Sequence, residues 1–378
     1  MIHFSINKAV FIQALNTTKR AISHKNAIPV LSTIKIEVNN EGIGLTGSNG
    51  QISIEHFISV QDDNAGLLIS STGSILLEAS FFINVVSSLP DIVLDLKEIE
   101  QKQVLLTSGK SEITLKGKEA ELYPRLQEVV KTKPLLLETK LLKDIINETA
   151  FAASTQESRP ILTGVHFVLT DNQTLKTVAT DSHRMSQRKI QLAKDGDNFD
   201  VVIPSRSLRE FAAVFSDEIE TVEVFFSNNQ MLFRSQHISF YTRLLEGTYP
   251  DTDRLIPTAF NTTVTFDTAN LRHAMERARL LSNATQNGTV KLEIQKGIVS
   301  AHVHSPEVGK VNEELDILAV DGEDLIISFN PTYLIDALKA VGNEQVKISF
   351  ISPIRPFTLV PNAEGEDFIQ LITPVRTN

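Results

Sequence analysis

The densest group of reactive side chains in this sequence lies between Thr180 and Arg184, where a hydroxyl, a carboxylate, an imidazole and a guanidinium occur together. A hydrolase could use such groups, with Asp181, His183 and Arg184 as its centre. That chemistry needs a nucleophile within hydrogen-bond reach of an oriented base, and adjacent residues of a turn rarely face one another. The segment therefore favours a turn over an active site, and a hydrolase remains the alternative hypothesis.

Two further patterns are typical of ligand sites. The glycines from Gly42 to Gly47 match G-x-G-x-x-G, but nucleotide binding requires a helix after the last glycine. The residues Gln51 to Ile54 alternate like a strand instead, which predicts a hairpin. His302 and His304 lie on one face of a strand and Glu307 follows, which could suggest a metal site. The sequence places no further metal ligand near them, so we expect these to be surface histidines. We expect no catalytic residue, no metal and no cofactor.

Composition excludes several classes of protein. The 378 residues contain no cysteine, which excludes disulfides, thiolate metal sites and cysteine nucleophiles, and is typical of a cytoplasmic chain. Residues 1–11 show no basic region followed by an apolar run, so no secretory signal is expected. No apolar stretch approaches the roughly 20 residues of a membrane span, so no membrane partner is expected.

The residues above must be positioned by a fold, and the apolar spacing predicts six similar helices. A helix that packs one face carries apolar residues at i, i+3, i+4 and i+7. The first positions of six such segments are 71, 60, 66, 63 and 63 residues apart, and six steps of 63 span all 378 residues. The segments are Phe11, Ala14, Leu15, Thr18; Phe82, Val85, Val86, Leu89; Leu142, Ile145, Ile146, Thr149; Leu208, Phe211, Ala212, Phe215; Leu271, Ala274, Met275, Ala278; and Leu334, Ala337, Leu338, Val341.

Boundary residues and strands fit the same repeat. Asn330 and Pro331 predict a helix start and Gly342 a helix end, while Thr139 and Ser205 are predicted N-caps and Pro90 a helix stop. Between the helices the apolar period changes to two, as in Ile34, Ile36 and Val38, which indicates half-buried strands. Turn residues such as Ser108-Gly109 and Lys296-Gly297 separate these strands.

Each unit is thus one helix with several antiparallel strands, and one helix cannot cover such a sheet alone. Pairing two units predicts an α+β protein of three similar domains, each with two helices packed on antiparallel sheets. The predicted domains are residues 1–129, 130–255 and 256–378.

The formal net charge of −10 argues against nucleic acid when taken as a whole. The six helical windows together carry +6, however, which leaves −16 for the rest of the chain. If every helix turns its polar face to one shared surface, that surface attracts phosphates without reading sequence, while the acidic exterior repels DNA. Chance variation of charge between elements is the alternative.

At Thr177 to Met185 the sequence TVATDSHRM resembles the T-V-A-T-D-G-H-R-L signature of bacterial DNA polymerase III beta subunits, the sliding clamps. Similar matches are Ile28 to Leu31 (the family's L-P-I-L), Leu45 to Asn49 (L-T-G-T-D), Gly247 to Asp251 (G-x-[FY]-P-D) and Pro374 to Arg376 (P-M-R). The matches follow the family's order through all three predicted domains. Ser182 replaces the usual glycine, and the chain extends two residues past Arg376.

The resemblance implies a homodimer whose two three-domain chains join head to tail into a DNA clamp ring around double-stranded DNA. It implies a non-catalytic processivity factor for DNA replication. The implied partners are the replicative DNA polymerase of the holoenzyme, an ATP-driven clamp loader, repair polymerases and other proteins that carry a clamp-binding motif. An outer pocket between the second and third domains would bury an apolar anchor of that motif.

The resemblance also assigns residues. The peptide pocket would comprise Leu162, Thr180, His183, Arg184, Met185, Pro250, Arg254, Leu255, Leu371, Ile372, Pro374, Val375 and Arg376, with Arg184, Arg254 and His183 as polar rim contacts. The DNA contacts would be Lys25, Gln156 and Arg206, to which the charge count adds Lys19, Arg272 and Arg277; Ser80 falls where the family can carry an arginine. At the dimer interface, Ile113 of one chain would meet Leu280 and Leu281 of the other.

The implied mechanism is topological. A closed ring cannot leave DNA sideways, so weak phosphate contacts are sufficient, and a tethered polymerase rebinds at high effective concentration. An open DNA-binding protein without ring closure is the second alternative, and it would be monomeric.

Overall fold

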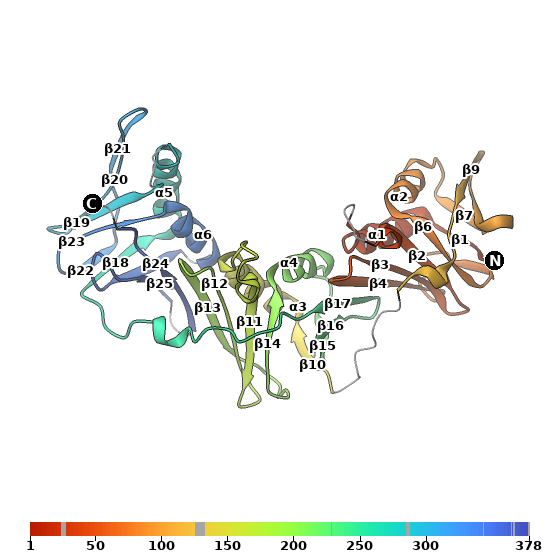
Figure 1. The fold of residues 1–378 in the computed structure, drawn as a ribbon, viewed down its shortest axis with the longest axis horizontal. Coiled ribbons are helices and arrows are strands. Elements are labelled where there is room, and N and C mark those ends of the chain that lie inside the picture. The colour runs from red at the N-terminus through yellow and green to blue at the C-terminus, as the bar shows by residue number, and fades with distance from the viewer. Residues whose placement is uncertain are drawn as a thin grey trace. The chain divides into compact units, whose positions relative to one another are not determined.

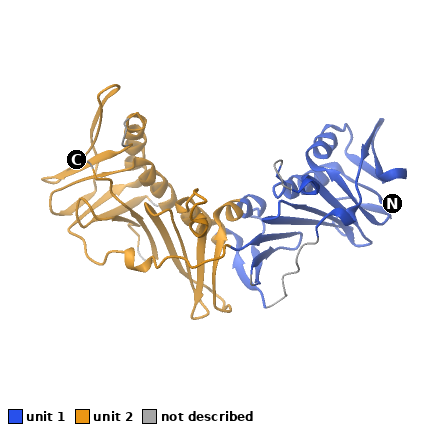
Figure 2. Ribbon diagram, viewed as in Figure 1, with its two compact units in different colours: residues 1–140, 210–244 blue, residues 141–209, 245–378 orange. Residues whose placement is uncertain are grey.

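The computed structural model describes residues 1–23, 28–124, 133–227, 229–284, 288–342, 344–363, 365 and 367–376. Lys25 and the predicted boundary between residues 129 and 130 lie outside these residues. The chain divides into two compact units, residues 1–140 with 210–244 and residues 141–209 with 245–378 (Figure 2). No helix within the described ranges is long and apolar enough to cross a membrane.

The six-part repeat is confirmed: a strand, a helix and three further strands recur six times along the described chain (Figure 1). The first repeat comprises β1 (His3–Asn7), α1 (Lys8–Lys19), β2 (Thr33–Val38), β3 (Gly42–Ser48), β4 (Ile52–Ser59) and an added β5 (Leu68–Ser71). The second comprises β6 (Gly73–Glu78), α2 (Ala79–Ser88), β7 (Val93–Glu98), β8 (Gln103–Ser108) and β9 (Ser111–Lys116).

The other four repeats keep the same order. The third is β10 (Leu135–Glu138), α3 (Thr139–Thr149), β11 (Gly164–Thr170), β12 (Thr174–Thr180) and β13 (Arg184–Gln191). The fourth is β14 (Phe199–Pro204), α4 (Ser205–Val214), β15 (Thr221–Phe226), β16 (Gln230–Arg234) and β17 (Ile238–Arg243). The fifth is β18 (Thr262–Asp267), α5 (Thr268–Ser282), β19 (Val290–Gln295), β20 (Ile298–Ser305) and β21 (Gly309–Glu314), with an added β22 (Ala319–Gly322). The sixth is β23 (Leu325–Phe329), α6 (Pro331–Val341), β24 (Gln345–Phe350), β25 (Phe357–Pro361) and β26 (Asp367–Ile372).

Repeats fold in pairs because each lends its first strand to the other. In the first pair β1 joins β7 and β6 joins β2. The second pair joins β10 to β15 and β14 to β11, and the third joins β18 to β24 and β23 to β19. Without the partner repeat, each of β6, β10, β14 and β23 would lose the one strand it pairs with among the described residues, which explains why two repeats form one domain.

Pairs of repeats are joined by their fourth strands. Within one unit β4 pairs with β17, and the resulting sheet has eight strands. Within the other unit β13 pairs with β26, and that sheet has nine. The fourth strands of the second and fifth repeats, β9 and β21, are edge strands with one neighbour each among the described residues.

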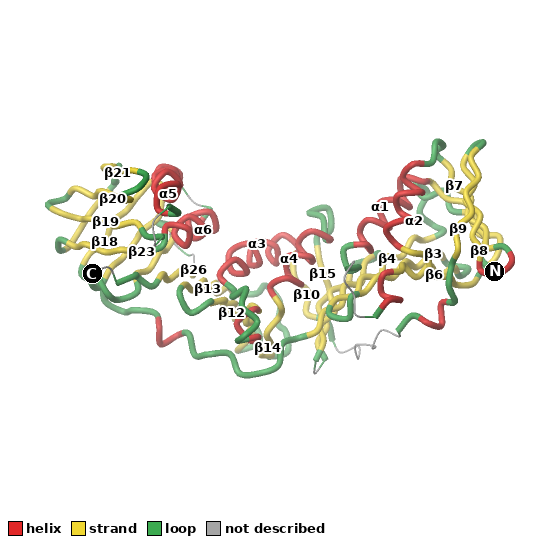
Figure 3. Tube along the Cα trace, turned by 45° about the horizontal axis from the view of Figure 1, so that its top comes forward, coloured by secondary structure: helices red, strands yellow, loops and turns green. Residues whose placement is uncertain are grey.

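The predicted helix faces are the buried faces. Of the positions named above only Val85 and Ala212 are half-buried, and all the others are buried. α1 packs against α2, and α5 against α6, over the strands of their own pair (Figure 3). Thr18 takes its predicted core position because its hydroxyl donates a hydrogen bond to the carbonyl of Ala14 at 2.8 Å.

The predicted boundaries of α6 are confirmed and those of α3 and α4 are wrong. The Asn330 side chain accepts from the amide of Thr332, Pro331 is the first helical residue, and Gly342 ends the helix at φ 64°. Thr139 and Ser205 are instead the first residues of their helices. Thr139 is fully buried and its hydroxyl has no hydrogen-bond partner within the described part of the chain, so the buried strand that precedes α3 overrides the capping preference.

The glycine-rich segment is a hairpin, as predicted. Gly42 to Ser48 form β3 and the chain returns as β4. A Cβ atom at Gly47 would lie 2.6 Å from the carbonyl oxygen of Thr18, so this glycine lets the strand pass under α1.

The turn from Thr180 to Arg184 has a copy in the first repeat, from Ser48 to Ile52. The Thr180 hydroxyl donates to the Arg184 carbonyl at 2.7 Å and accepts from the Ser182 amide at 3.1 Å. The Ser48 hydroxyl makes the same two bonds, to the Ile52 carbonyl and from the Gly50 amide, at 3.1 Å each. The third position has positive φ in both, 77° at Ser182 and 86° at Gly50.

The two turns predict opposite effects of one exchange. Replacing Ser182 by glycine should raise the free energy of unfolding by about 1 kcal/mol, because left-handed backbone costs a residue with Cβ roughly that much. Replacing Gly50 by serine should lower it by a similar amount, since no atom lies within 4 Å of the added Cβ and only the backbone conformation changes. Urea unfolding of both variants measures the effects. A shift of the same sign in both would contradict this account.

Candidate functional site

A small apolar cluster, separate from the main cores, lies where β13 meets β26. Its buried residues come from the turn η5 (Pro160–Thr163), from β12, β13, β14 and β26, and from the segment after β17. They are Leu162, Val178, Met185, Val202, Tyr249 and Leu371, with Ile161, Leu245 and Ile256 packed around them. We call this set the joint cluster. Three of its members, Leu162, Met185 and Leu371, are predicted pocket residues.

The chain segments that adjoin the joint cluster in sequence carry exposed apolar residues. Leu255 in the short turn η6 (Asp253–Leu255) is 51% exposed and Val375 is 38% exposed. Pro250 and Arg376 are exposed and Pro374 is half-buried. Arg254 is exposed and its guanidinium lies 2.8 Å from the Asp251 carboxylate. Large apolar side chains left in water beside buried ones are typical of a surface that binds another protein.

The turn from Thr180 to Arg184 is held from several sides. The Tyr249 hydroxyl accepts from the Thr180 amide at 3.1 Å, and burial raises the pKa of this phenol above its usual range. One Asp181 carboxylate oxygen accepts from the amides of His183 and Arg184 at 2.9 and 3.0 Å. The His183 ring stacks on Tyr333 with ring centres 6.4 Å apart and an interplanar angle of 14°.

Arg184, a predicted rim contact of the pocket, takes part in a polar network. Its guanidinium donates to the Asp181 carboxylate at 3.0 Å, to the Asp336 carboxylate at 2.7 Å and to the Phe151 carbonyl at 2.9 Å. It also lies over the rings of Phe151 and Tyr333, 5.4 and 4.8 Å from their centres. These contacts tie the third repeat to α6.

Ile372 also differs from its predicted place. It is 1% exposed and belongs to the core of the last two repeats, whereas its neighbour Leu371 belongs to the joint cluster. Consecutive residues of a strand point to opposite faces, so only one of the two can contribute to the pocket.

The geometry opposes a hydrolase. The Thr180 hydroxyl donates to a backbone carbonyl. The Asp181 carboxylate accepts hydrogen bonds from two backbone amides and from Arg184. The His183 ring stacks on Tyr333. No nucleophile–base pair forms among them, and the equivalent turn at Ser48 keeps the same bonds without histidine or arginine. The hydroxyl and carboxylate that suggested catalysis are the parts that build the turn.

The predicted DNA contacts fall into three groups. Gln156 and Arg206 are exposed, and Lys19 is half-buried near the end of α1. Arg272 and Arg277 on α5 form ion pairs with Glu276 and Glu313, so part of their charge is already balanced. Ser80 lies in the first turn of α2, and Lys25 lies outside the described residues.

The predicted dimer residues lie on or near edge strands. Ile113 is half-buried on β9, against the core of the first two repeats. Leu280 on α5 is 76% exposed, whereas Leu281 is half-buried against the core of the last two repeats. Leu280 is thus the residue with free apolar surface.

His302 on β20 has polar partners. His302 lies 2.9 Å from the Asn312 amide oxygen and 2.8 Å from the Ser300 hydroxyl. The described residues contain no group of three or more histidine, aspartate or glutamate side chains placed to hold a metal ion.

Sequence reasoning missed Phe151, Tyr333 and Asp336 in the Arg184 network. Tyr333 and Asp336 are three apart on α6, a spacing that places both on one helix face. That signal is present in the sequence, but nothing in it says which turn the face meets.

The comparisons agree over the whole chain. Family models for the DNA polymerase III beta subunit match residues 2–127 (N-terminal domain), 136–251 (central domain) and 253–376 (C-terminal domain). The beta sliding clamp of Streptococcus pneumoniae serotype 4 is 77% identical over 378 residues, and that of Lactococcus lactis subsp. lactis 57% over 380, with 100% of each chain covered.

Solved structures agree as well. The DNA polymerase III beta chain of S. pneumoniae TIGR4 superposes with a TM-score of 0.99 at 77% identity. The sliding clamp of Bacillus subtilis superposes with a TM-score of 0.96 at 37% identity, and 100% of each chain is covered in both comparisons. The chain therefore belongs to the DNA polymerase III beta subunit family, the non-catalytic sliding clamps of the replicative DNA polymerase.

Proposed function

We propose that two copies of this chain close head to tail into a ring around duplex DNA and hold the replicative polymerase on its template. Each copy contributes three domains, residues 1–129, 130–255 and 256–378. The observation that carries the proposal is that two of the six fourth strands have a free edge. Four of the six fourth strands pair within the chain, and only β9 and β21 lack a second neighbour among the described residues.

Pairing β9 of one copy with β21 of the other would repeat the fourth-strand joint already made twice. An unpaired edge invites aggregation, and ring closure would cover the free edges of β9 and β21 in each copy. Ile113 on β9 and the exposed Leu280 on α5, a helix that contacts β21, would add apolar contact to the backbone hydrogen bonds.

The DNA contacts are proposed to be few and electrostatic. We assign them to Gln156, Arg206, Lys19 and Lys25 rather than to Arg272 and Arg277, because the last two are engaged by carboxylates. Contacts to phosphates alone carry no sequence information and weaken with salt, which suits a ring that must slide.

The joint cluster with Leu255 and Val375 is the proposed dock for client proteins. A leucine or phenylalanine anchor buried there would gain roughly 1.5–3 kcal/mol of transfer free energy. The polymerase, a clamp loader and repair polymerases would compete for this one surface in the cytoplasm.

Retention on DNA tests the ring. The protein, loaded by a clamp loader onto nicked circular DNA, should remain bound through gel filtration at high salt. It should be lost once the circle is cut, because a ring slides off a free end. An open DNA-binding protein would leave both forms alike, and that result would refute ring closure.

The dimer is tested at Leu280. Replacement by aspartate should give monomers at micromolar concentration in sedimentation velocity, because a charge would be buried at the joint. Unfolding of the monomer should be unchanged, since the side chain is exposed. The exposed Leu318 offers a matched control, whose aspartate variant should stay dimeric. A dimeric Leu280→Asp protein would place the interface elsewhere.

The client dock is tested at Leu255. Replacement by alanine should weaken binding of a labelled peptide with a leucine–phenylalanine anchor about tenfold, as loss of a buried anchor contact does. Fluorescence anisotropy measures this, and the exposed Ile354 offers a control substitution to alanine with no effect. Equal affinities for both variants would show that the anchor binds away from Leu255.

A further inference from the structure

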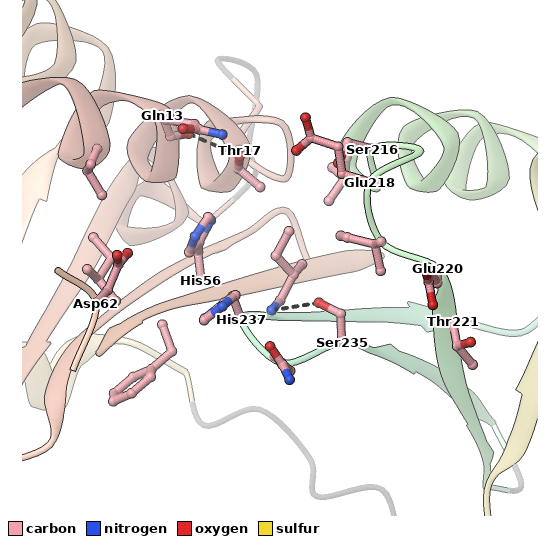
Figure 4. Close-up of a pocket in the computed structure, with 17 residues that line it drawn as sticks. Gln13, Thr17, His56, Asp62, Ser216, Glu218, Glu220, Thr221, Ser235 and His237 are labelled. Atoms are coloured by element: carbon pink, nitrogen blue, oxygen red, sulfur yellow. Dashed lines mark hydrogen bonds between the residues drawn. The ribbon is translucent and has the colours of Figure 1, made fainter. Parts of the chain in front are cut away.

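The joint between β4 and β17 contains a cavity with no part in the proposed function. Its volume is about 590 Å³, and all of its lining residues belong to one compact unit. α1 and the segment from Ser216 to Thr221 form its walls, and the ends of β4 and β17 form its floor (Figure 4). His56 and His237 lie side by side on the floor, with Asp62 at one end and Glu220 at the other (Figure 4).

The joint between β13 and β26 shows what fills the equivalent space. The turns at Ser48 and Thr180 are equivalent, which aligns His56 of β4 with Arg188 of β13. Thr18 and Thr149 both donate to the carbonyl four residues earlier, which aligns Thr17 with Glu148. By strand register, Ile238 lies opposite His56 and Phe368 opposite Arg188.

Those equivalent positions differ in a consistent way. The Arg188 guanidinium lies 3.5 Å from the Glu148 carboxylate and 5.8 Å from the centre of the Phe368 ring. In the other joint the arginine, the glutamate and the aromatic ring are replaced by His56, Thr17 and Ile238. All three replacements are smaller, and the cavity is lined by them. One joint thus holds its own guanidinium, and the other has room for one.

The charges of the cavity favour a cation. Asp62, Glu218 and Glu220 line it, and no lysine or arginine among the described residues does. Burial, with a smaller contribution from nearby His237, lowers the pKa of His56 to about 4, so this imidazole is neutral at pH 7. The Nδ1 atom of His56 is buried and has no hydrogen-bond partner among the described residues. The cavity therefore offers carboxylates and a neutral imidazole, and it disfavours anions.

We infer that this cavity binds a guanidinium group on an aliphatic arm, either an arginine side chain of a peptide or a small free guanidine. The guanidinium would occupy the place that Arg188 fills in the other joint, beside His56 and the carboxylate of Glu218 or Glu220. Val10, Val214 and Ile219 would contact the methylene groups of the arm. A planar cation with several donors matches carboxylates better than an ammonium does.

Binding is tested with agmatine on the full-length protein at pH 7.5 and low salt, by calorimetry and thermal shift. Agmatine should bind and raise the melting temperature, and cadaverine, a diammonium of similar reach, should bind more weakly. Capped arginine amide distinguishes the sources, since tighter binding of it points to a peptide and tighter binding of agmatine to a free guanidine. No agmatine binding at 10 mM, on the order of the weakest specific site, would overturn the inference, as would equal affinity for cadaverine.

Variants locate the site. Glu218→Gln with Glu220→Gln should weaken agmatine binding about fivefold or more, as loss of two partly exposed carboxylate contacts does. Asp217→Asn removes one charge from the same segment outside the lining and should leave the affinity unchanged. Equal loss in both proteins would mean diffuse attraction and would refute the cavity.

A second variant fills the cavity from within. Thr17→Glu with His56→Arg rebuilds the ion pair of the other joint, and it should abolish agmatine binding while circular DNA is retained as before. Binding that survives this change in the folded protein would overturn the inference. If this variant does not fold, agmatine binding to the Glu218→Gln, Glu220→Gln variant decides whether the cavity is the site.

Discussion

Every backbone amide and carbonyl of a buried strand must find a partner, and this requirement organises the molecule. Each repeat ends in a fourth strand whose outer edge would otherwise be unpaired. In one unit β4 pairs with β17, and in the other β13 pairs with β26. The same requirement, applied to β9 and β21, makes a second copy of the chain the natural partner. The proposed ring would thus follow from the pairing needs of these sheet edges.

The reciprocal exchange of first strands serves the same requirement inside each pair. β1 completes a sheet made mainly by the second repeat, and β6 completes one made by the first. The amphipathic helices α1 and α2 then share one core that neither repeat could enclose alone. Opening one repeat would expose both its strand edge and its half of that core, which couples the two repeats in stability.

Local periodicity was enough to predict the helices, their buried faces, the strand alternation and the pairing of repeats. It succeeded where the spacing of apolar residues alone identifies the buried face. Leu334, Ala337 and Leu338 mark the buried face of a helix, and Ile34, Ile36 and Val38 mark that of a strand. It failed where distant residues decide. The network around Arg184 could not be predicted, because Asp336 and Phe151 lie 152 and 33 residues from it in the sequence. Thr139 is a residue type that often caps helices, but the preceding strand places it in the core.

Duplication explains why reactive residues in this chain are a poor guide to chemistry. The turns at Ser48 and Thr180 share their hydrogen bonds. The side-chain hydroxyl, the amide or carboxylate oxygen and the residue with positive φ are therefore needed simply to form the turn. All five residues differ in type between the two turns, and the last position differs most, with Ile52 in one copy and Arg184 in the other. The arginine binds Asp336 of α6, and among the described residues Ile52 makes no such side-chain bonds. One backbone frame thus supports a joint with its own guanidinium and a joint with an acidic cavity, and the difference lies in a few side chains.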